Sequence, residues 1–237
     1  MIKFSIIIPC FNEIESLPFL LEKFSKFLNR DDIEIILVDN GSYDGSKEKI
    51  PDLIKNYFFA KSIRLEKNIG YGDGILKGIL NSTGEYVGWT HADLQTDIKD
   101  ILEGIKIIET FEIKKKSKEI YVKGTRKNRN LIDNLFTQGM SIFVSIIFGK
   151  FMWDINAQPN ILYRKMMERW PKPPLDFSFD LFIFVQSVRS RYHIKRFNVD
   201  FPKRIFGKSK WNFNFYSKLK FSFKTIRYAL FLKKILK

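Results

Sequence analysis

Short apolar runs alternate with segments of helical spacing along the first half of the chain. The runs are rich in β-branched residues and predict buried strands at 3–8, 33–38, 61–65 and 85–90. Apolar positions recur every three to four residues between them and predict helices at 14–28, 46–57, 71–81 and 98–111. Strands that alternate with helices indicate βαβ units. The pattern therefore predicts an α/β fold with a mostly parallel central sheet.

The second half of the chain is less regular. Its pattern predicts strands at 119–123, 161–164 and 193–201, and helices at 131–148 and 177–191. No flexible linker separates the halves, so we expect one Rossmann-like domain at 1–211. That domain would have a nucleotide-binding half at 1–112 and an acceptor half at 113–211, followed by a basic amphipathic tail at 212–237.

Composition excludes several classes of protein. Of 237 residues, 45% are hydrophobic and 24 are Phe, which is too apolar for a disordered chain. The single cysteine, Cys10, excludes an intramolecular disulfide framework and fits a reducing compartment. The longest apolar stretch, 140–149, is about half the length that a membrane span needs.

The net charge of +15 is concentrated at the C-terminal end. Asp200 is the last acidic residue, so the first 200 residues carry a net charge of +4 and the last 37 carry +11. A basic tail of this kind suggests nucleic acid, an anionic membrane or a phosphorylated ligand as partner. Composition alone does not choose among them.

Polar residues follow the predicted strands, where open parallel sheets bind their ligands. The first strand leads into 9–13 (PCFNE), in which Asn12 or Glu13 has a simpler interpretation as a helix cap. Asp39 ends the second strand and would accept hydrogen bonds from a base or ribose, or simply stabilise a turn. Three alternate glycines at 70–74 permit a ligand to approach the backbone closely, although they do not form the dinucleotide fingerprint.

The fourth strand is followed by His91, Asp93 and Gln95. Side chains at alternate positions of an extended segment lie on the same side. The three together would hold one divalent cation, Mg²⁺ or Mn²⁺. Taken alone, His91 is better explained as a hydrogen-bonded loop histidine, and we expect Asp97 to cap the following helix.

Four segments in this order resemble the family 2 glycosyltransferases with a GT-A fold: 5–13 (SIIIPCFNE), 38–45 (VDNGSYDG), 68–72 (NIGYG) and 92–95 (ADLQ). Within the family, the chain looks most like the dolichyl- or polyprenyl-phosphate mannose and glucose synthases. Gly124-Thr125-Arg126 resembles that branch's Gly-Ser-Arg element. Segment 154–160 resembles the one after its apolar helix, and 204–210 resembles its Arg-x-x-Gly-x-Ser-Lys signature. The likeness runs from residue 3 to about 211.

The resemblance implies roles for the matching positions. Two sets belong to the donor: a nucleotide pocket of Pro9, Phe11, Glu13, Asp39, Asn40, Gly70 and Asp93, and a metal site of His91, Asp93 and Gln95. A third set would hold donor or acceptor phosphates: Arg126, Arg204, Ser209 and Lys210. Asp93, Arg126 and Arg204 would be the catalytic residues, because cationic groups stabilise a diphosphate leaving group. The simpler interpretation of Arg204 and Lys210 is a solvated basic tail.

The chain departs from the branch at three points. His91 stands where an Asp is usual and removes one negative charge from the metal site, and Asn40 also replaces an Asp. No clear acidic pair is present to serve as general base, and Asp180 is nearest to where one would be sought. A phosphate monoester is already an anion near neutral pH, so the missing pair favours a lipid-phosphate acceptor over a sugar hydroxyl.

The tail 211–237 has no acidic residue and many apolar ones. Phe215, Leu219, Phe223, Ile226 and Leu230 recur at helical spacing, with Lys220, Lys224 and Arg227 on other faces. A basic amphipathic helix of this kind lies flat on an anionic membrane. The alternative is a helix packed on the body with solvated lysines. The apolar helix 135–149 would likewise contact lipid or belong to the core.

These patterns and the resemblance together favour a metal-dependent, inverting hexosyltransferase. It would move a sugar from a nucleotide-sugar donor to a dolichyl or undecaprenyl phosphate, peripherally at the cytoplasmic face of the membrane. The first alternative is a family 2 enzyme acting on a sugar hydroxyl of a glycan acceptor. The second is a non-catalytic protein that binds nucleotide or nucleic acid. The favoured interpretation expects no nucleic-acid partner.

Overall fold

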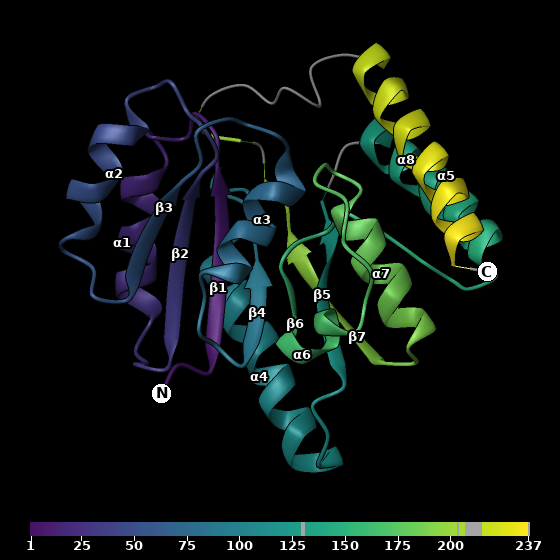
Figure 1. The fold of residues 1–237 in the computed structure, drawn as a ribbon, viewed down its shortest axis with the longest axis horizontal. Helices are drawn as coiled ribbons and strands as arrows, with labels where there is room; N and C mark the ends of the chain where they lie inside the picture. Colours follow the sequence, from purple (N-terminus) through teal and green to yellow (C-terminus); the bar gives the residue numbers. More distant parts are fainter. Residues whose placement is uncertain (129–130, 203, 207–214, 237) are drawn as a thin grey trace.

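A computed structural model describes residues 1–128, 131–202, 204–206 and 215–236. Its centre is a seven-stranded sheet in the order β3-β2-β1-β4-β6-β5-β7 (Figure 1). The strands are β1 (Phe4–Cys10), β2 (Ile33–Asp39), β3 (Ala60–Arg64), β4 (Tyr86–Trp89), β5 (Ile120–Lys127), β6 (Asn160–Tyr163) and β7 (His193–Asp200). All neighbours are parallel except β6, which is antiparallel to β4 and β5. The predicted mostly parallel sheet is therefore confirmed.

Eight helices are described: α1 (Leu17–Phe27), α2 (Ser46–Ile54), α3 (Tyr71–Leu80), α4 (Ile98–Lys115), α5 (Leu131–Phe148), α6 (Arg164–Glu168), α7 (Phe179–Arg189) and α8 (Phe215–Ile235). Two local predictions were wrong. Strand β1 continues through Pro9 to Cys10, in register with β2, and Ser16, not Asn12 or Glu13, is the N-cap residue of α1. The predicted cap of α4 is confirmed, because Asp97 accepts the Lys99 N–H at 2.9 Å within a capping box.

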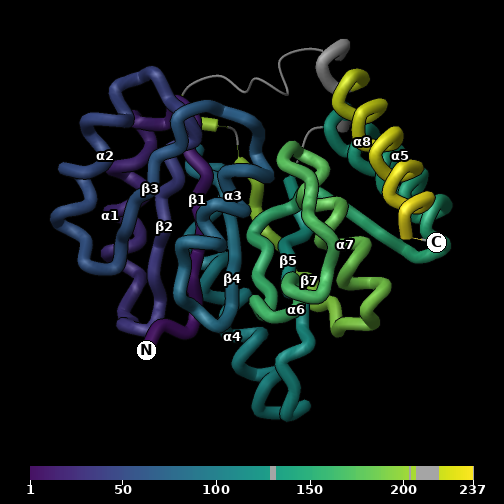
Figure 2. Tube along the Cα trace, in the orientation of Figure 1, coloured from purple at the N-terminus to yellow at the C-terminus, as the bar shows by residue number. Residues whose placement is uncertain are grey.

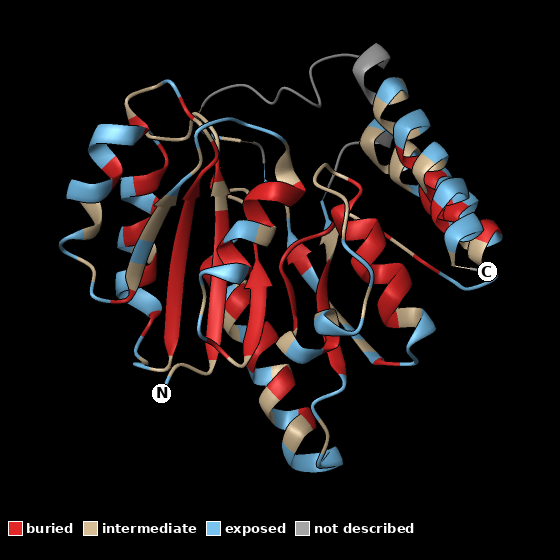
Figure 3. Cartoon of the chain, in the orientation of Figure 1, coloured by how far each residue is buried: buried red, intermediate tan, exposed pale blue. Residues whose placement is uncertain are grey.

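Two apolar cores lie on opposite faces of the sheet because strand side chains alternate in direction. Ile6 and Ile8 pack in the core that includes α1 and α4, whereas Ile7 packs in the core that includes α3 and α7. Figure 3 shows the central strands buried over most of their length. Burial on both faces explains why these strands are continuous apolar runs.

Helices α5 and α8 form a separate layer outside α7, at the end of the molecule opposite α1 and α2 (Figures 1 and 2). The face of α8 that packs inward carries Thr225, Ala229 and Leu232, each less than 5% exposed. Phe223 and Leu230, predicted to share one apolar face, are 67% and 53% exposed and lie on the outer side of the helix. No helix within the described ranges is both long and apolar enough to cross a membrane.

Candidate functional site

The loops after β1 and β2 form one rigid wall at the carboxyl edge of the sheet. The Asn12 N–H donates to Ser42 Oγ at 3.0 Å, and the Tyr43 N–H donates to Asn12 Oδ1 at 3.0 Å. The ring of Phe11 meets the ring of Tyr43 edge-on, with 5.8 Å between centroids. Asn12 adopts a φ of 58°, which polar residues with short side chains tolerate best. The wall offers aromatic surface beside backbone polar groups.

Asp39 lies beneath this wall and is fully engaged by the protein. One carboxylate oxygen accepts the Ser42 N–H at 2.9 Å and the other forms an ion pair with Arg64. The side chain therefore stabilises a turn and forms an ion pair, while its expected role toward a base or ribose stays a prediction. Sequence reasoning missed Arg64, although parallel pairing of β2 with β3 places it directly opposite Asp39.

Asn40 and the glycine-rich loop contact other protein segments closely. The Asn40 amide donates to the Gly70 carbonyl at 2.9 Å, and its buried Oδ1 has no hydrogen-bond partner. A Cβ on Gly70 would lie 2.3 Å from the Leu175 carbonyl oxygen, and one on Gly72 would lie 2.5 Å from that of Pro174. The close approach expected for a ligand is therefore made by residues 174–176.

Two acidic residues meet one arginine above the sheet. Arg204 forms an ion pair with Glu13 and lies 3.6 Å from Asp93, measured from Nη1 to Oδ2. These residues come from the loops after β1, β4 and β7, and the fold brings them together as the resemblance implied. Burial raises the pKa of Glu13, and Arg204 opposes that rise. Arg204, one of the basic residues that follow the last acidic residue of the chain, thus lies between two carboxylates of the site.

The segment 91–96 was wrongly expected to be extended. It bends, with Leu94 at a φ of 62°, so the alternation of side chains does not apply. Asp93 Oδ1 accepts the Gln95 N–H at 3.2 Å, and the Gln95 amide donates to the Pro202 carbonyl at 2.8 Å. Gln95 therefore fastens the segment after β7 over this site.

His91 lies between the rings of Tyr71 and Phe201, at 6.4 and 6.3 Å between centroids. Burial lowers the pKa of His91, and the charge of Asp93 opposes that effect while Arg126 and Arg204 reinforce it. The imidazole is thus held neutral beside one carboxylate and two guanidinium groups. A neutral imidazole can ligate a metal or hydrogen-bond a phosphate.

The predicted metal ligands of the protein fit a divalent cation only if substrate phosphates complete its coordination. No group of three His, Cys, Asp or Glu side chains able to hold a metal occurs in the part of the chain that the structure describes. Asp93 would supply one carboxylate, His91 one imidazole and Gln95 one amide oxygen. Mg²⁺ is commonly held by one or two carboxylates together with substrate phosphates and water, so the residues present fit a metal bound with a diphosphate.

Arg126 is fixed in place at the end of β5. Its backbone N–H and its Nε donate to Asp154 at 2.8 and 3.0 Å, and its guanidinium lies 5.4 Å from the centroid of the Phe201 ring. The loop that carries Asp154 is held from below by Lys123, a fully buried lysine whose ammonium donates to three carbonyls, those of residues 154, 155 and 157. Asp154 and Lys123 were not among the predicted site residues.

Asp180 lies in a buried polar network. Its carboxylate oxygens accept from Trp89 Nε1 at 2.8 Å and from Gln158 Nε2 at 3.1 Å, and its side chain is 2% exposed. Burial raises its pKa to about 6. Asp176, the other acidic residue of this segment, pairs with Lys224 at 2.7 Å. Neither carboxylate is free in this arrangement.

Two predicted phosphate-binding residues, Ser209 and Lys210, lie outside the described residues.

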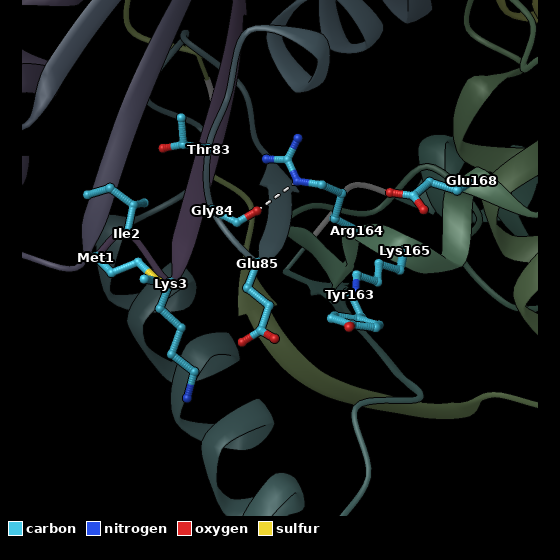
Figure 4. A pocket seen from close by; sticks show the side chains of 10 residues that line it. All are labelled: Met1, Ile2, Lys3, Thr83, Gly84, Glu85, Tyr163, Arg164, Lys165 and Glu168. Atoms are coloured by element: carbon cyan, nitrogen blue, oxygen red, sulfur yellow. Dashed lines mark hydrogen bonds between the residues drawn. The ribbon is translucent and has the colours of Figure 1, made fainter.

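A cavity of about 500 Å³ lies at the opposite edge of the sheet, where β1 and β4 begin and β6 ends (Figure 4). Arg164 crosses it to donate to the Gly84 carbonyl at 2.7 Å. None of the predicted site residues lines this cavity.

Solved structures share this fold. One is the glucosyl-3-phosphoglycerate synthase of Mycobacterium tuberculosis in complex with Mn²⁺, UDP and glucosyl-3-phosphoglycerate, at a TM-score of 0.71 and 13% identity over 98% of this chain and 79% of that one. Another is a mannosyltransferase of Pyrobaculum calidifontis in complex with GDP-Man and Mn²⁺, at a TM-score of 0.68 and 16% identity over 99% and 64%. These are GT-A glycosyltransferases, so the expected fold class is confirmed.

Curated relatives carry sugar-transferase names. A dolichyl-phosphate beta-glucosyltransferase of Dictyostelium discoideum is 28% identical over 70% of this chain and 55% of its own length. An undecaprenyl-phosphate 4-deoxy-4-formamido-L-arabinose transferase of Photorhabdus laumondii is 28% identical over 89% and 63%. The chain thus spans less than two thirds of either relative.

A family model settles the classification that the motifs implied. The model described as glycosyl transferase family 2 matches residues 5–140, more than half of the chain. That range contains the wall after β1 and β2, the glycine-rich loop, Asp93 and Arg126. The chain belongs to glycosyl transferase family 2.

Proposed function

We propose that the protein transfers a sugar, with inversion, from a nucleotide-sugar donor to a polyprenyl phosphate at the cytoplasmic surface of a membrane. The observation that carries the proposal is the meeting of Glu13, Asp93 and Arg204 at the carboxyl edge of the sheet, with His91 and Arg126 beside them. The names of the relatives, which include dolichyl- and undecaprenyl-phosphate transferases, support the acceptor class.

The donor nucleotide would bind along the wall formed by the loops after β1 and β2. The exposed ring of Tyr43 and the half-buried ring of Phe11 offer stacking surface for a base. Asp39 and Arg64 brace the wall beneath, and Asn40 Oδ1 is the acceptor left for a donor group. The diphosphate would then extend toward Asp93.

The chemistry requires charge stabilisation on the leaving diphosphate. A Mg²⁺ or Mn²⁺ ion held by Asp93, His91 and Gln95 would act as a Lewis acid on that group. The Arg204 guanidinium already lies at this point, held by an ion pair with Glu13 and 3.6 Å from Asp93 before any substrate binds. Preoriented cations stabilise developing negative charge without the cost of reorganising at the moment of reaction.

The acceptor would be a phosphate monoester because neither carboxylate of the segment where a general base would be sought, Asp176 or Asp180, is free to remove a proton. The second pKa of a phosphate monoester is about 6, so the acceptor phosphate is an anion at neutral pH and no base has to remove a proton from it. Arg126 suits it, because a planar guanidinium binds two phosphate oxygens at once. The carboxylates of Asp176 and Asp180 are both occupied by protein donors.

Transfer to a sugar hydroxyl is the second candidate function. The pKa of about 6 for Asp180 favours it, because a general base works best with a pKa near the operating pH. Against it, Asp180 is buried and bonded to Trp89 and Gln158. An acceptor hydroxyl would have to displace one of those donors to reach the carboxylate.

The membrane surface is the expected partner of the outer layer. Helix α8 turns Phe223, Leu230 and Phe231 outward, each more than half exposed, with basic residues beside them. Apolar side chains with neighbouring cations suit an anionic lipid surface.

Calorimetric titration tests the donor site directly. UDP and GDP would each be titrated into the protein with Mn²⁺, with Mg²⁺ and with a chelator. The proposal expects at least one nucleotide to bind in a metal-dependent way. Absence of metal-dependent binding for nucleoside diphosphates of every base would contradict it.

A further inference from the structure

A second cavity, of about 520 Å³, lies far from the candidate active site. It opens where the C-terminal ends of α5, α7 and α8 meet, at the end of the outer layer marked C in Figure 1. The site described above lies instead at the carboxyl edge of the sheet. None of the predicted donor or acceptor residues lines this cavity.

The floor of the cavity is apolar and well packed. Met152, Val185 and Ile147 contribute to it and are 0%, 1% and 7% exposed. Val188 and Leu236 line it as half-buried side chains. A volume of this order is ordinary for a small-molecule site, which typically encloses roughly 300–1,000 Å³.

The rim of the cavity is cationic. Lys150, Arg189, Arg191 and Lys233 line it, all are exposed, and no lining residue is acidic. Within the described ranges, no carboxylate forms an ion pair with any of the four. Arg189 donates to the Leu236 carbonyl, which joins the end of α7 to the end of α8. Four like charges around one opening are mutually unfavourable unless an anion joins them.

The exposed apolar surface of the outer layer reaches the cavity. Ile146 lines the opening and is 73% exposed, and Ile235 near the end of α8 is 52% exposed. An occupant therefore meets positive charge and apolar surface together. This combination excludes a free inorganic anion as the best fit, because the apolar floor would stay uncovered.

We propose that this cavity binds one anionic phospholipid, with its headgroup phosphate among the four cations and the start of its acyl chains over Ile146, Val188 and Leu236. A bound lipid would hold the α5–α8 layer in one orientation on the membrane. The inference rests on the membrane part of the proposed function and is independent of sugar transfer.

Monomeric short-chain lipids test the site without a bilayer. Thermal unfolding of the full chain would be followed with dihexanoyl-phosphatidylglycerol, dihexanoyl-phosphatidylcholine or glycerol phosphate, each below the micellar range. We expect a saturable rise in Tm with the anionic lipid alone, since a ligand that binds only the folded state stabilises it. An equal rise with phosphatidylcholine or with glycerol phosphate would overturn the proposal.

A double variant and a matched control locate the binding. The double variant Lys150→Gln/Lys233→Gln should weaken the affinity roughly tenfold or more, because each cation near an anionic lipid contributes appreciably. The control Lys47→Gln/Lys49→Gln removes the same charge from exposed positions on α2, at the other end of the molecule, and should bind as the parent does.

A third variant separates a cavity from a charged patch. Val188→Trp fills the cavity while keeping all four cations, and it should abolish the rise in Tm produced by the anionic lipid. Unchanged lipid affinity in Val188→Trp or in the double variant would overturn the proposal. Titration of UDP with Mn²⁺ into the same variants should match the parent, so a failure of the donor-site proposal would be seen separately.

Discussion

Asp93 lies where the loops after β1, β4 and β7 meet, between the Arg204 guanidinium and the turn that leads into α4. It is 9% exposed and accepts one backbone N–H, from Gln95. An asparagine at this position would keep that hydrogen bond and lose the negative charge. The charge and the fold can therefore be tested separately.

Asp93→Asn should abolish metal-dependent nucleotide binding and lower kcat by at least about 100-fold, in the range seen when a charge-stabilising group is removed. Titration calorimetry and a transfer assay measure the two effects, and circular dichroism checks the fold. The control Asp31→Asn removes an exposed carboxylate remote from the site and should change neither. A fully active Asp93→Asn protein would refute the metal assignment.

Asp154 is a positioning residue for Arg126. Asp154→Asn should leave nucleotide binding unchanged and raise the KM for a phosphorylated acceptor about tenfold, because Arg126 loses its charged anchor. Arg126→Lys should show the same split between the two substrates. If nucleotide binding weakened in parallel with the acceptor KM, the assignment of Arg126 to the acceptor would be wrong.

The family resemblance placed Glu13 in the nucleotide pocket, Asp93 at the metal and Arg126 and Arg204 at phosphates. These roles stay predictions, although the fold does bring Glu13, Asp93 and Arg204 together. The sequence did not indicate that Lys123 is buried, because a lysine within a strand is normally expected to be exposed. In the structure, hydrogen bonds to three carbonyls compensate its burial. Nothing local in the sequence indicates that residues 174–176 approach the glycines at 70 and 72, and the role of these glycines toward a ligand stays a prediction.

At the scale of elements, a buried carboxylate lies at the edge of the sheet opposite the candidate site. Glu34 of β2 is 2% exposed and accepts from Ser5, Thr83 and Lys61. Burial would raise its pKa, but these donors outweigh burial and lower the pKa to about 2. The carboxylate therefore contributes stability above its ordinary pKa of 4.5, and that contribution is lost as the pH falls toward 2.

Glu34→Gln should reduce the free energy of unfolding at pH 7 by roughly 1–3 kcal/mol, the cost of weakening a charged buried network. The difference between parent and variant should shrink as the pH falls from 4.5 toward 2. Urea denaturation across that range measures it. A difference that stays constant with pH would show that Glu34 is not the titrating group.

Helix α8 serves two surfaces at once. Its Leu232 side chain is fully buried against the body, whereas Phe223 and Phe231 are 67% and 55% exposed. Apolar spacing in the sequence predicted the helix but not which face is covered, because that depends on α5, far away in the chain. Removing the whole tail would therefore uncover α5 as well, and point variants give the cleaner test.

Phe223→Ser/Phe231→Ser should weaken binding to anionic vesicles by roughly tenfold or more and leave Tm unchanged, because the lost side chains face outward. Leu232→Ser should have the opposite profile, with a lower Tm from the polar group buried in the core. Vesicle sedimentation and thermal unfolding measure the two. Vesicle binding equal to the parent in the double variant would contradict a membrane-facing α8.

At the scale of the whole molecule, the position of the sheet's carboxyl edge explains where the basic C-terminal residues lie. The basic segment after Asp200 first passes over the carboxyl edge of the sheet, where Arg204 meets Glu13 and Asp93, and then forms the exposed layer with α5. The C-terminal segment thus supplies one guanidinium, that of Arg204, to the candidate site and other basic residues to an exposed outer face. This arrangement favours an acceptor that carries a phosphate at a lipid surface.

The acceptor phosphate is the central claim, and a paired acceptor assay tests it most directly. A radiolabelled nucleotide sugar, chosen by the donor that binds with Mn²⁺, would be incubated with the protein and either undecaprenyl phosphate or undecaprenol in matched vesicles. We predict label in the lipid fraction with the phosphate and none with the free alcohol. Transfer to the alcohol, or only to a sugar hydroxyl, would contradict the account.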